Sequence, residues 1–313
     1  MQKNVKKLII AVIVLAVTNL ITGGWIVYDK YFNNSFSNDY PLIDVSRNFI
    51  PQEHFIVNLQ PIREELRNLV AQEGPNSISL YFEFLNTGAN ISINPDLKIW
   101  PASLAKLPLA LAVMKKVENG VWQLDNQLVL LEGDKDTESG TLFNHPVGTP
   151  FTIEELFKEL LSNSDNTAYR ILLRNMSTTE LQPIIEEIGL DDFFDKEGKV
   201  SAKEYSRLFR TLYTSSFLKR ENSSKILTWL SELDFHKFLA SGIDGKTTFA
   251  HKWGANRKVH VFADSGIVYV PNRPYIITVM IQSDGTSTGE QKAEELMQKI
   301  SSSIYQYVLL YKN

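Results

Sequence analysis

The 313-residue sequence contains no cysteine. This absence excludes disulfide bonds, a thiol nucleophile and metal sites built on cysteine. The five histidines, His54, His145, His236, His251 and His260, show none of the clustered spacings that are typical of metal ligands. We therefore expect no metal site and no cofactor.

An excess of positive charge is also missing, because the formal net charge is −4. Without a basic stripe the sequence does not indicate a nucleic-acid partner. Ala240–Thr247 (ASGIDGKT) matches a loose phosphate-loop pattern, but it follows a predicted helix and precedes a predicted strand, the reverse of the order such a loop requires. A Gly-x-Ser-x-Gly elbow is absent, which argues against an α/β-hydrolase.

A long uncharged run occurs near the N-terminus. Leu8–Tyr28 follows three lysines and ends at Asp29-Lys30. Such a run can span a bilayer with its positive flank in the cytoplasm. We expect residues 1–30 to be a single-pass anchor in the cell membrane, residues 31–55 a polar stalk, and the remainder an extracytoplasmic domain. A cleaved signal peptide is the alternative.

The domain expected over residues 56–313 changes its hydrophobic period along the chain. Residues 56–71 repeat at helical spacing, whereas residues 76–84 alternate and predict a strand with one buried face. Further strands are predicted near both ends of the domain, at 91–93, 247–253, 259–270 and 275–281. Helices are predicted between them, within 152–230, and a closing helix at 290–311. We predict an α/β fold of the α+β type. Its antiparallel sheet is formed by both chain ends and flanked by helices, with an inserted all-helical subdomain at about residues 120–240.

Trp100–Gly120 reads as a buried helix that begins with Ser103 and Lys106. Residues three apart share one helix face, where an amine can take the proton of a serine hydroxyl if burial keeps that amine neutral. The alternative is a small residue and a surface lysine at a helix start. A second such pair, Ser216 and Lys219, lies in a polar stretch and is expected to be solvated.

Three motifs follow one another in the chain: Ser103-x-x-Lys106, Ser164-Asp165-Asn166 and Lys252-Trp253-Gly254. This order resembles that of class A β-lactamases and penicillin-binding proteins. The phrases GTPFTIEELFKELLSNSDNTA and DSGIVYVPNRPYIITVMIQ are also similar to that family, and the resemblance covers roughly residues 56–308. It implies a β-lactamase/transpeptidase-like fold.

The resemblance implies a role for each matched residue. Ser103 would be the acylated nucleophile, Lys106 the base that takes its proton, and Ser164 the group that passes a proton to the leaving nitrogen. Asn166 would hold the substrate amide, and Lys252 would add positive charge.

The remaining matched positions would border the substrate. Ala255 and Ser103 would supply the two backbone N–H groups of an oxyanion hole. Gly254 and Trp253 complete the third motif, and Asp165 is expected to orient its turn.

Two departures from the family pattern bear on activity. Trp253 stands where the family has a hydroxyl that binds the substrate carboxylate, so Asn256 or Arg257 would have to replace it, unless Trp253 simply packs. A glutamate in the E-x-x-L-N pattern, which activates the deacylating water in class A enzymes, is missing, and Gly189–Ser201 is short for the loop that carries it.

The acidic turn in that short stretch leaves two readings. One of its carboxylates could be a stand-in base, or the turn is simply solvated; its acids are Asp191, Asp192, Asp195 and Glu197.

The sequence thus predicts a serine hydrolase that forms an acyl-serine intermediate. Its expected partner is a small-molecule β-lactam or a D-Ala-D-Ala-like peptidoglycan stem peptide, with poor deacylation. The alternative is a catalytically silent envelope module of the same fold that binds peptidoglycan or a partner.

Overall fold

The computed structural model describes residues 14–20, 22–24, 41–43, 58–73, 77–191, 193, 197–283, 285–286 and 289–310. Residues 42–313 form one compact unit, and residues 1–41 form another. In the N-terminal unit, 14–20 and 22–24 are helical. No helix within the described ranges is both long and apolar enough to cross a membrane. Most of the expected anchor and stalk lies outside these ranges, so both stay predictions.

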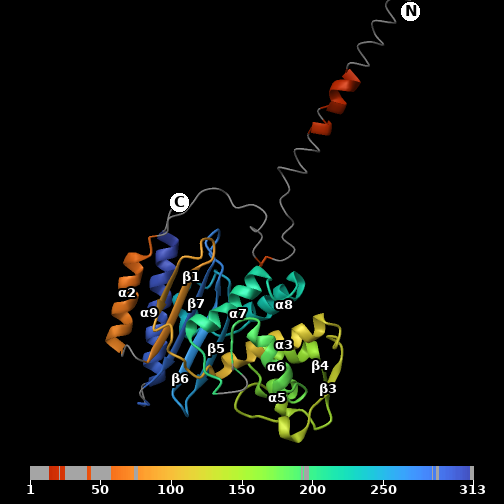
Figure 1. The fold of residues 1–313 in the computed structure, drawn as a ribbon, viewed down its shortest axis with the longest axis vertical. Coiled ribbons are helices and arrows are strands. Elements are labelled where there is room, and N and C mark those ends of the chain that lie inside the picture. The colour runs from red at the N-terminus through yellow and green to blue at the C-terminus, as the bar shows by residue number, and fades with distance from the viewer. Residues whose placement is uncertain are drawn as a thin grey trace, which may run out of the picture. The chain divides into compact units, whose positions relative to one another are not determined.

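A five-stranded antiparallel sheet forms the centre of the larger unit (Figure 1). Its order is β2 (Asn90–Ile93), β1 (Ile78–Phe84), β7 (Tyr275–Gln282), β6 (Val261–Val268) and β5 (Phe249–Asn256). The register places Ile78 opposite Ile281, so strands from both ends of the domain meet at the middle of the sheet. The predicted α+β fold with a sheet built from both chain ends is confirmed.

Strand β1 is buried along all seven residues, whereas its alternating pattern predicted one buried face. The even-numbered residues of β1 lie in the core between the sheet and helices α2 (Gln60–Glu73) and α9 (Gly289–Leu310). The other face lies under α7 (Ala202–Thr214), where Glu83 accepts hydrogen bonds from Tyr81 and Arg210. The polar residues of β1 are therefore buried because a helix of the insert supplies their partners.

The helices between the strands are largely where their capping signals predict them. Beside α7 they are α3 (Lys106–Glu118), α4 (Ile153–Ser162), α5 (Asn166–Arg174), α6 (Thr178–Glu186) and α8 (Arg220–Ser231). Thr152 and Glu155 form a capping box at the start of α4. The insert is not wholly helical, because β3 (Gln127–Val129) and β4 (Pro150–Thr152) pair as a small antiparallel sheet.

Helix α3 passes through the middle of the insert. The run from Lys106 to Met114 is buried on every side, and Pro108 lies in the first turn, where its missing N–H has no helical partner to lose. A 3₁₀ helix, η2 (Ala102–Ala105), precedes α3 and carries Ser103. The predicted single helix thus starts as a tighter turn, which presents Ser103 just ahead of Lys106.

Candidate active site

Ser103 lies where η2 meets the edge strand of the large sheet. The preceding residue, Ala102, has a φ of +50°, a conformation that non-glycine residues rarely adopt outside strained or functional turns. A β-carbon on Gly254 of β5 would lie 2.7 Å from the backbone nitrogen of Ser103 and 3.1 Å from the carbonyl oxygen of Pro101. Glycine at position 254 therefore allows β5 to approach the serine backbone.

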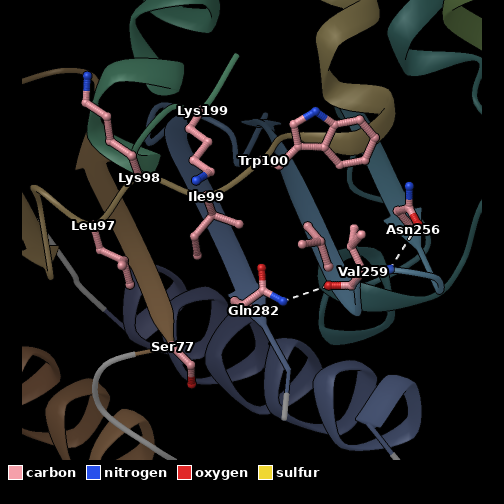
Figure 2. A pocket seen from close by; sticks show the side chains of 10 residues that line it. Ser77, Leu97, Lys98, Ile99, Trp100, Lys199, Asn256, Val259 and Gln282 are labelled. Carbon is pink, nitrogen blue, oxygen red and sulfur yellow. Dashed lines mark hydrogen bonds between the residues drawn. The ribbon is translucent and has the colours of Figure 1, made fainter. Parts of the chain in front are cut away.

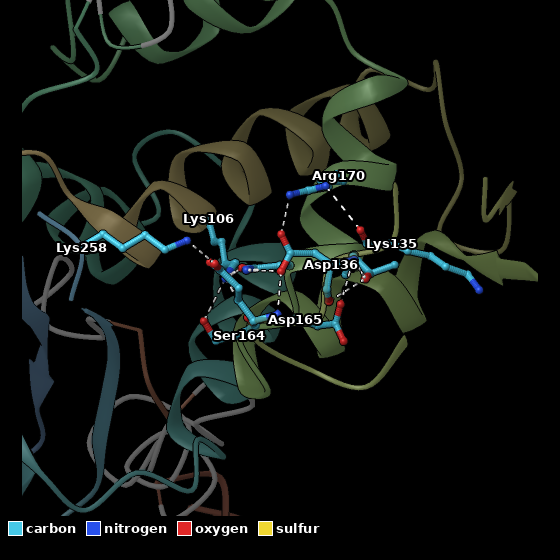
Figure 3. A network of polar contacts seen from close by, with 11 residues as sticks. Lys106, Lys135, Asp136, Ser164, Asp165, Arg170 and Lys258 are labelled. Atoms are coloured by element: carbon cyan, nitrogen blue, oxygen red, sulfur yellow. Dashed lines mark hydrogen bonds and ion pairs between the residues drawn. The ribbon is translucent and has the colours of Figure 1, made fainter. Parts of the chain in front are cut away.

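The amine of Lys106 is the centre of the polar contacts (Figure 3). Its Nζ lies 3.1 Å from Oγ of Ser103 and 3.1 Å from Oγ of Ser164. It also donates to the backbone oxygen of Ser164 at 2.7 Å and to Oδ1 of Asn166 at 2.6 Å. The first two predicted motifs therefore meet at one nitrogen atom.

The Ser164-Asp165-Asn166 turn is held by the aspartate. Asp165 is fully buried and caps α5 by accepting from the N–H of Ala168 at 2.8 Å. Its other oxygen accepts from the N–H groups of Thr141 and Leu142. Ser164 has a φ of +53°, so the turn presents its hydroxyl and the Asn166 amide to Lys106. These contacts agree with the orienting role expected for Asp165.

Burial lowers the pKa of the Lys106 amine to about 8, and the negative charges of Asp165 and Asp136 act in the opposite direction. At neutral pH this amine is mostly an ammonium, but a usable fraction is neutral. An amine of this pKa beside a hydroxyl is suited to proton transfer.

Asp136 is a site residue that the sequence analysis did not single out. Its Oδ1 accepts from Nδ2 of Asn166 at 3.0 Å, which leaves Oδ1 of Asn166 facing Lys106. Arg170 on α5 pairs with the same carboxylate. Hydrogen bonds from Asn166 and from the N–H of Glu138 hold the pKa of Asp136 below its usual value, against the effect of burial. Asp136 lies in a turn-rich loop, and no spacing signal marks it.

Lys252 is fully buried, and its Nζ donates to the backbone oxygen of Leu161 at 3.1 Å. Burial lowers its pKa well below the usual value, and the positive charge of Lys106 lowers it further. The family resemblance implied that Lys252 adds positive charge to the site. In the structure burial is the main cause of the lowered pKa of Lys106, and burial lowers the pKa of Lys252 as well.

Trp253 points away from these groups. Its indole stacks on Phe235 with ring centroids 4.0 Å apart and planes 12° apart, and it meets Phe238 edge-on at 6.0 Å. Successive residues of a strand face opposite sides, so Lys252 and Trp253 cannot share one face. The geometry favours the packing alternative for Trp253 over substrate contact.

A cavity of about 250 Å³ opens beside Ser103. Its walls include the predicted residues Ser103, Lys106, Asn166 and Ala255, together with Asp136. Asn256 also lines this cavity, whereas Arg257 is paired with Glu290 through two contacts of 2.6 Å. Of the two expected substitutes for the family hydroxyl, Asn256 is therefore the one at the cavity.

The model of the beta-lactamase enzyme family matches residues 61–308. The chain belongs to the beta-lactamase enzyme family. Two curated relatives are beta-lactamase VEB-1 of Pseudomonas aeruginosa, 23% identical over 250 residues (72% of this chain, 83% of VEB-1), and beta-lactamase regulatory protein BlaB of Streptomyces cacaoi, 29% identical over 140 residues. The BlaB match spans 44% of each chain.

Solved structures of the beta-lactamase and PBP type share the fold. PBP-A superposes with a TM-score of 0.71 at 23% identity, covering 80% of this chain and 96% of PBP-A. A beta-lactamase from Sphaerobacter thermophilus gives a TM-score of 0.70 at 19% identity, covering 82% and 100% of the two chains. These similarities confirm the predicted β-lactamase/transpeptidase-like architecture.

The acidic turn before α7 contributes no described carboxylate to the cavity beside Ser103. Glu197 is exposed and pairs with Lys199 at 2.6 Å, and neither it nor Asp191 borders the space beside Ser103. Asp192 and Asp195 lie outside the described residues. Ser216 and Lys219 are exposed, as their polar context predicted.

Proposed function

We propose that this protein is an acyl-transfer serine hydrolase that attacks a β-lactam or a D-Ala-D-Ala-like amide through an acyl-Ser103 intermediate. The observation that carries the proposal is the amine of Lys106, which lies 3.1 Å from the hydroxyl of Ser103 and whose pKa burial lowers to about 8. An oriented base with a pKa near neutrality is what an alcohol nucleophile requires.

Acylation would begin when the neutral Lys106 amine takes the Ser103 proton as Oγ bonds to the substrate carbonyl carbon. The negative charge on the carbonyl oxygen would be held by the N–H groups of Ser103 and Ala255, a contribution of roughly 3 kcal/mol per donor. Ser164 would then deliver a proton from Lys106 to the departing nitrogen as the carbon–nitrogen bond breaks. The contact between Lys106 and Ser164 supports this route.

Lys252 would respond to the charge of the substrate. Its burial favours the neutral amine in the free protein. A carboxylate arriving near it would raise its pKa and favour the ammonium, so substrate binding would be coupled to proton uptake. Asn256, at the cavity wall, would take over part of the carboxylate recognition that the family assigns to a hydroxyl.

Deacylation would be slow, because the expected glutamate is absent from the sequence. Glu138 also lines the cavity, but it is exposed and paired with Lys258 at 2.7 Å. The acyl-enzyme would therefore accumulate. One of the solved neighbours is a PBP-A mutant described as an acyl-enzyme complex with penicillin G, with a TM-score of 0.71 and 24% identity, which supports acylation as an activity this fold can host.

The decisive experiment is mass spectrometry of the intact protein after exposure to penicillin G. We expect the protein to gain the mass of one penicillin, and Ser103→Ala to gain nothing. Ser216→Ala is the matched control, since Ser216 belongs to the other Ser-x-x-Lys pair and is exposed. Rapid steady-state hydrolysis of a chromogenic β-lactam would contradict slow deacylation.

A catalytically silent envelope module is the second candidate. The observation in its favour is Trp253, which occupies the hydroxyl position of the third motif and packs on Phe235. A wild-type protein that forms no adduct with penicillin G, and none with a peptide thioester, would establish this alternative.

A further inference from the structure

A second and larger cavity, of about 500 Å³, shares lining residues with the one at Ser103. Figure 2 shows the side chains that line this second cavity. Leu97, Ile99 and Trp100 form one wall, and Val259 from the turn after β5 forms the other. Trp100 and Val259 are 38% and 48% exposed, so both present apolar surface to solvent at this cavity. We refer to this second cavity as the side groove.

The side groove is continuous with the candidate active site. Trp100 and Asn256 line both cavities. Trp100 precedes Ser103 by three residues, and Asn256 directly follows Ala255, whose N–H is the proposed oxyanion donor. A molecule held at Ser103 therefore reaches the side groove by passing these two side chains.

The side groove has a positive edge. Lys98 and Lys199 line it, and Figure 2 shows the amine of Lys199 directed into it. None of its described lining residues is an aspartate or a glutamate. Both lysines have surface partners, Lys98 with Glu204 at 3.1 Å and Lys199 with Glu197 at 2.6 Å. Exposed pairs of this kind contribute little, so a ligand carboxylate can share these amines.

The chemistry at Ser103 decides which part of a substrate faces the side groove. The leaving nitrogen must face Ser164, which contacts Lys106 on the helical side. The acyl portion then extends on the side of β5, an edge strand of the sheet. Extended peptides commonly add to such an edge, where main-chain hydrogen bonds hold them. An acyl portion that extends along β5 and beyond Asn256 reaches Val259.

We propose that the side groove binds the acyl-side extension of a peptidyl substrate, namely an apolar residue followed by a residue that carries a carboxylate. The apolar side chain contacts Trp100 and Val259, and the carboxylate pairs with Lys199. This assignment rests on the proposed function, because it takes Ser103 as the reacting group. It selects an extended peptide amide over a compact β-lactam as the better-bound substrate.

The test measures binding of synthetic peptides to full-length Ser103→Ala protein by isothermal titration calorimetry. The probes are acetyl-Glu-Leu-D-Ala-D-Ala, its Gln counterpart and the truncated acetyl-D-Ala-D-Ala. We expect the Glu peptide to bind about fivefold more tightly than the Gln peptide, as one partly exposed ion pair allows. The truncated peptide is expected to bind more weakly than both.

Two further variants, each combined with Ser103→Ala, locate the effect. Lys199→Gln should abolish the preference for Glu, whereas Lys246→Gln, in an exposed turn outside the groove, should retain it. Val259→Asp places a carboxylate on the groove wall and should reverse the preference. Thermal melts of each variant establish that it folds.

Equal affinity for all three peptides, or a Glu preference that persists in the Lys199→Gln protein, would overturn the assignment. The proposed function is tested separately by the penicillin adduct of the wild-type protein. An adduct without any gain from peptide extension therefore rejects the side groove alone, whereas no adduct with penicillin G and none with a peptide thioester rejects the hydrolase.

Discussion

Gly254 and Ser103 lie so close that a β-carbon on the glycine would be 2.7 Å from the serine nitrogen. The neighbouring atoms are two backbone atoms and the rigid Cβ of Ala102, so neither side can yield without moving η2 or β5. We predict that Gly254→Ala displaces the edge strand from the serine and lowers the rate of penicillin adduct formation at least about 100-fold, the usual cost of a displacement near 1 Å.

Gly245→Ala is the control for that substitution, because a β-carbon there would meet open space. It should leave the rate of adduct formation unchanged. The measurement is the second-order rate of acylation, followed by mass spectrometry. A Gly254→Ala protein that acylates at the wild-type rate would show that β5 does not need its close approach.

The pKa of Lys106 predicts a pH profile for acylation. The neutral amine is the active form, so the rate should rise with pH, reach half its plateau near pH 8 and level off above it. The charge of Asp136 raises this pKa, so Asp136→Asn should move the midpoint to lower pH. The exposed Asp125→Asn serves as the control. A rate that falls with pH would contradict Lys106 as the base.

The stacked pair of Trp253 and Phe235 predicts a stability effect. Trp253→Thr restores the hydroxyl typical of the family but removes a stacked contact, and should lower the free energy of unfolding by about 2 kcal/mol. Phe235→Leu should cost less. The double variant should be less destabilised than the sum of the two, by about 1 kcal/mol, in urea denaturation.

If Trp253 instead served the substrate, the outcome would differ. Trp253→Thr would then change penicillin acylation while the unfolding free energies of the single variants simply added.

Two ion pairs on the loop beside the cavity predict losses of stability of different size. Asp134 is buried and accepts from Nε and Nη2 of Arg174 at 2.8 and 2.9 Å, which ties the loop to α5. Arg174→Met leaves that carboxylate without its cation and should cost about 2 kcal/mol of stability. Glu138→Gln breaks a solvent-exposed pair with Lys258 and should cost less than about 0.5 kcal/mol. Chemical denaturation of the two variants compares them, and equal losses would refute the distinction.

Local signals in the sequence predicted local structure well. Thr152 with Glu155 marked the start of α4, and the spacing of Leu59, Ile62 and Leu66 marked the face of α2. The meeting of Ser103 and Lys106 also follows from helical spacing alone. The joining of the first two motifs at one amine was predicted only through the family resemblance, since Lys106 and Ser164 are 58 residues apart.

What the sequence could not show depends on neighbours far along the chain. Alternation in β1 predicts one apolar face but cannot reveal that α7 covers the polar one. Asp136 lies in a loop, and its contact with Asn166 arises from tertiary packing. Burial lowers the pKa of Lys252, and no motif encodes that burial. Proton states and loop contacts therefore required the structure.

The pairing of β1 with β7 sets the order in which the molecule can be completed. Ile78 on β1 pairs with Ile281 on β7, so β1 emerges from the ribosome long before β7, the strand that joins it to the rest of the sheet. Closing so long a loop is slow, and the helical stretch between them has time to organise first. A chain cut anywhere before residue 275 would leave β1 paired with β2 alone and without β7, its neighbour toward the middle of the sheet, which makes the C-terminal quarter indispensable for completing the sheet.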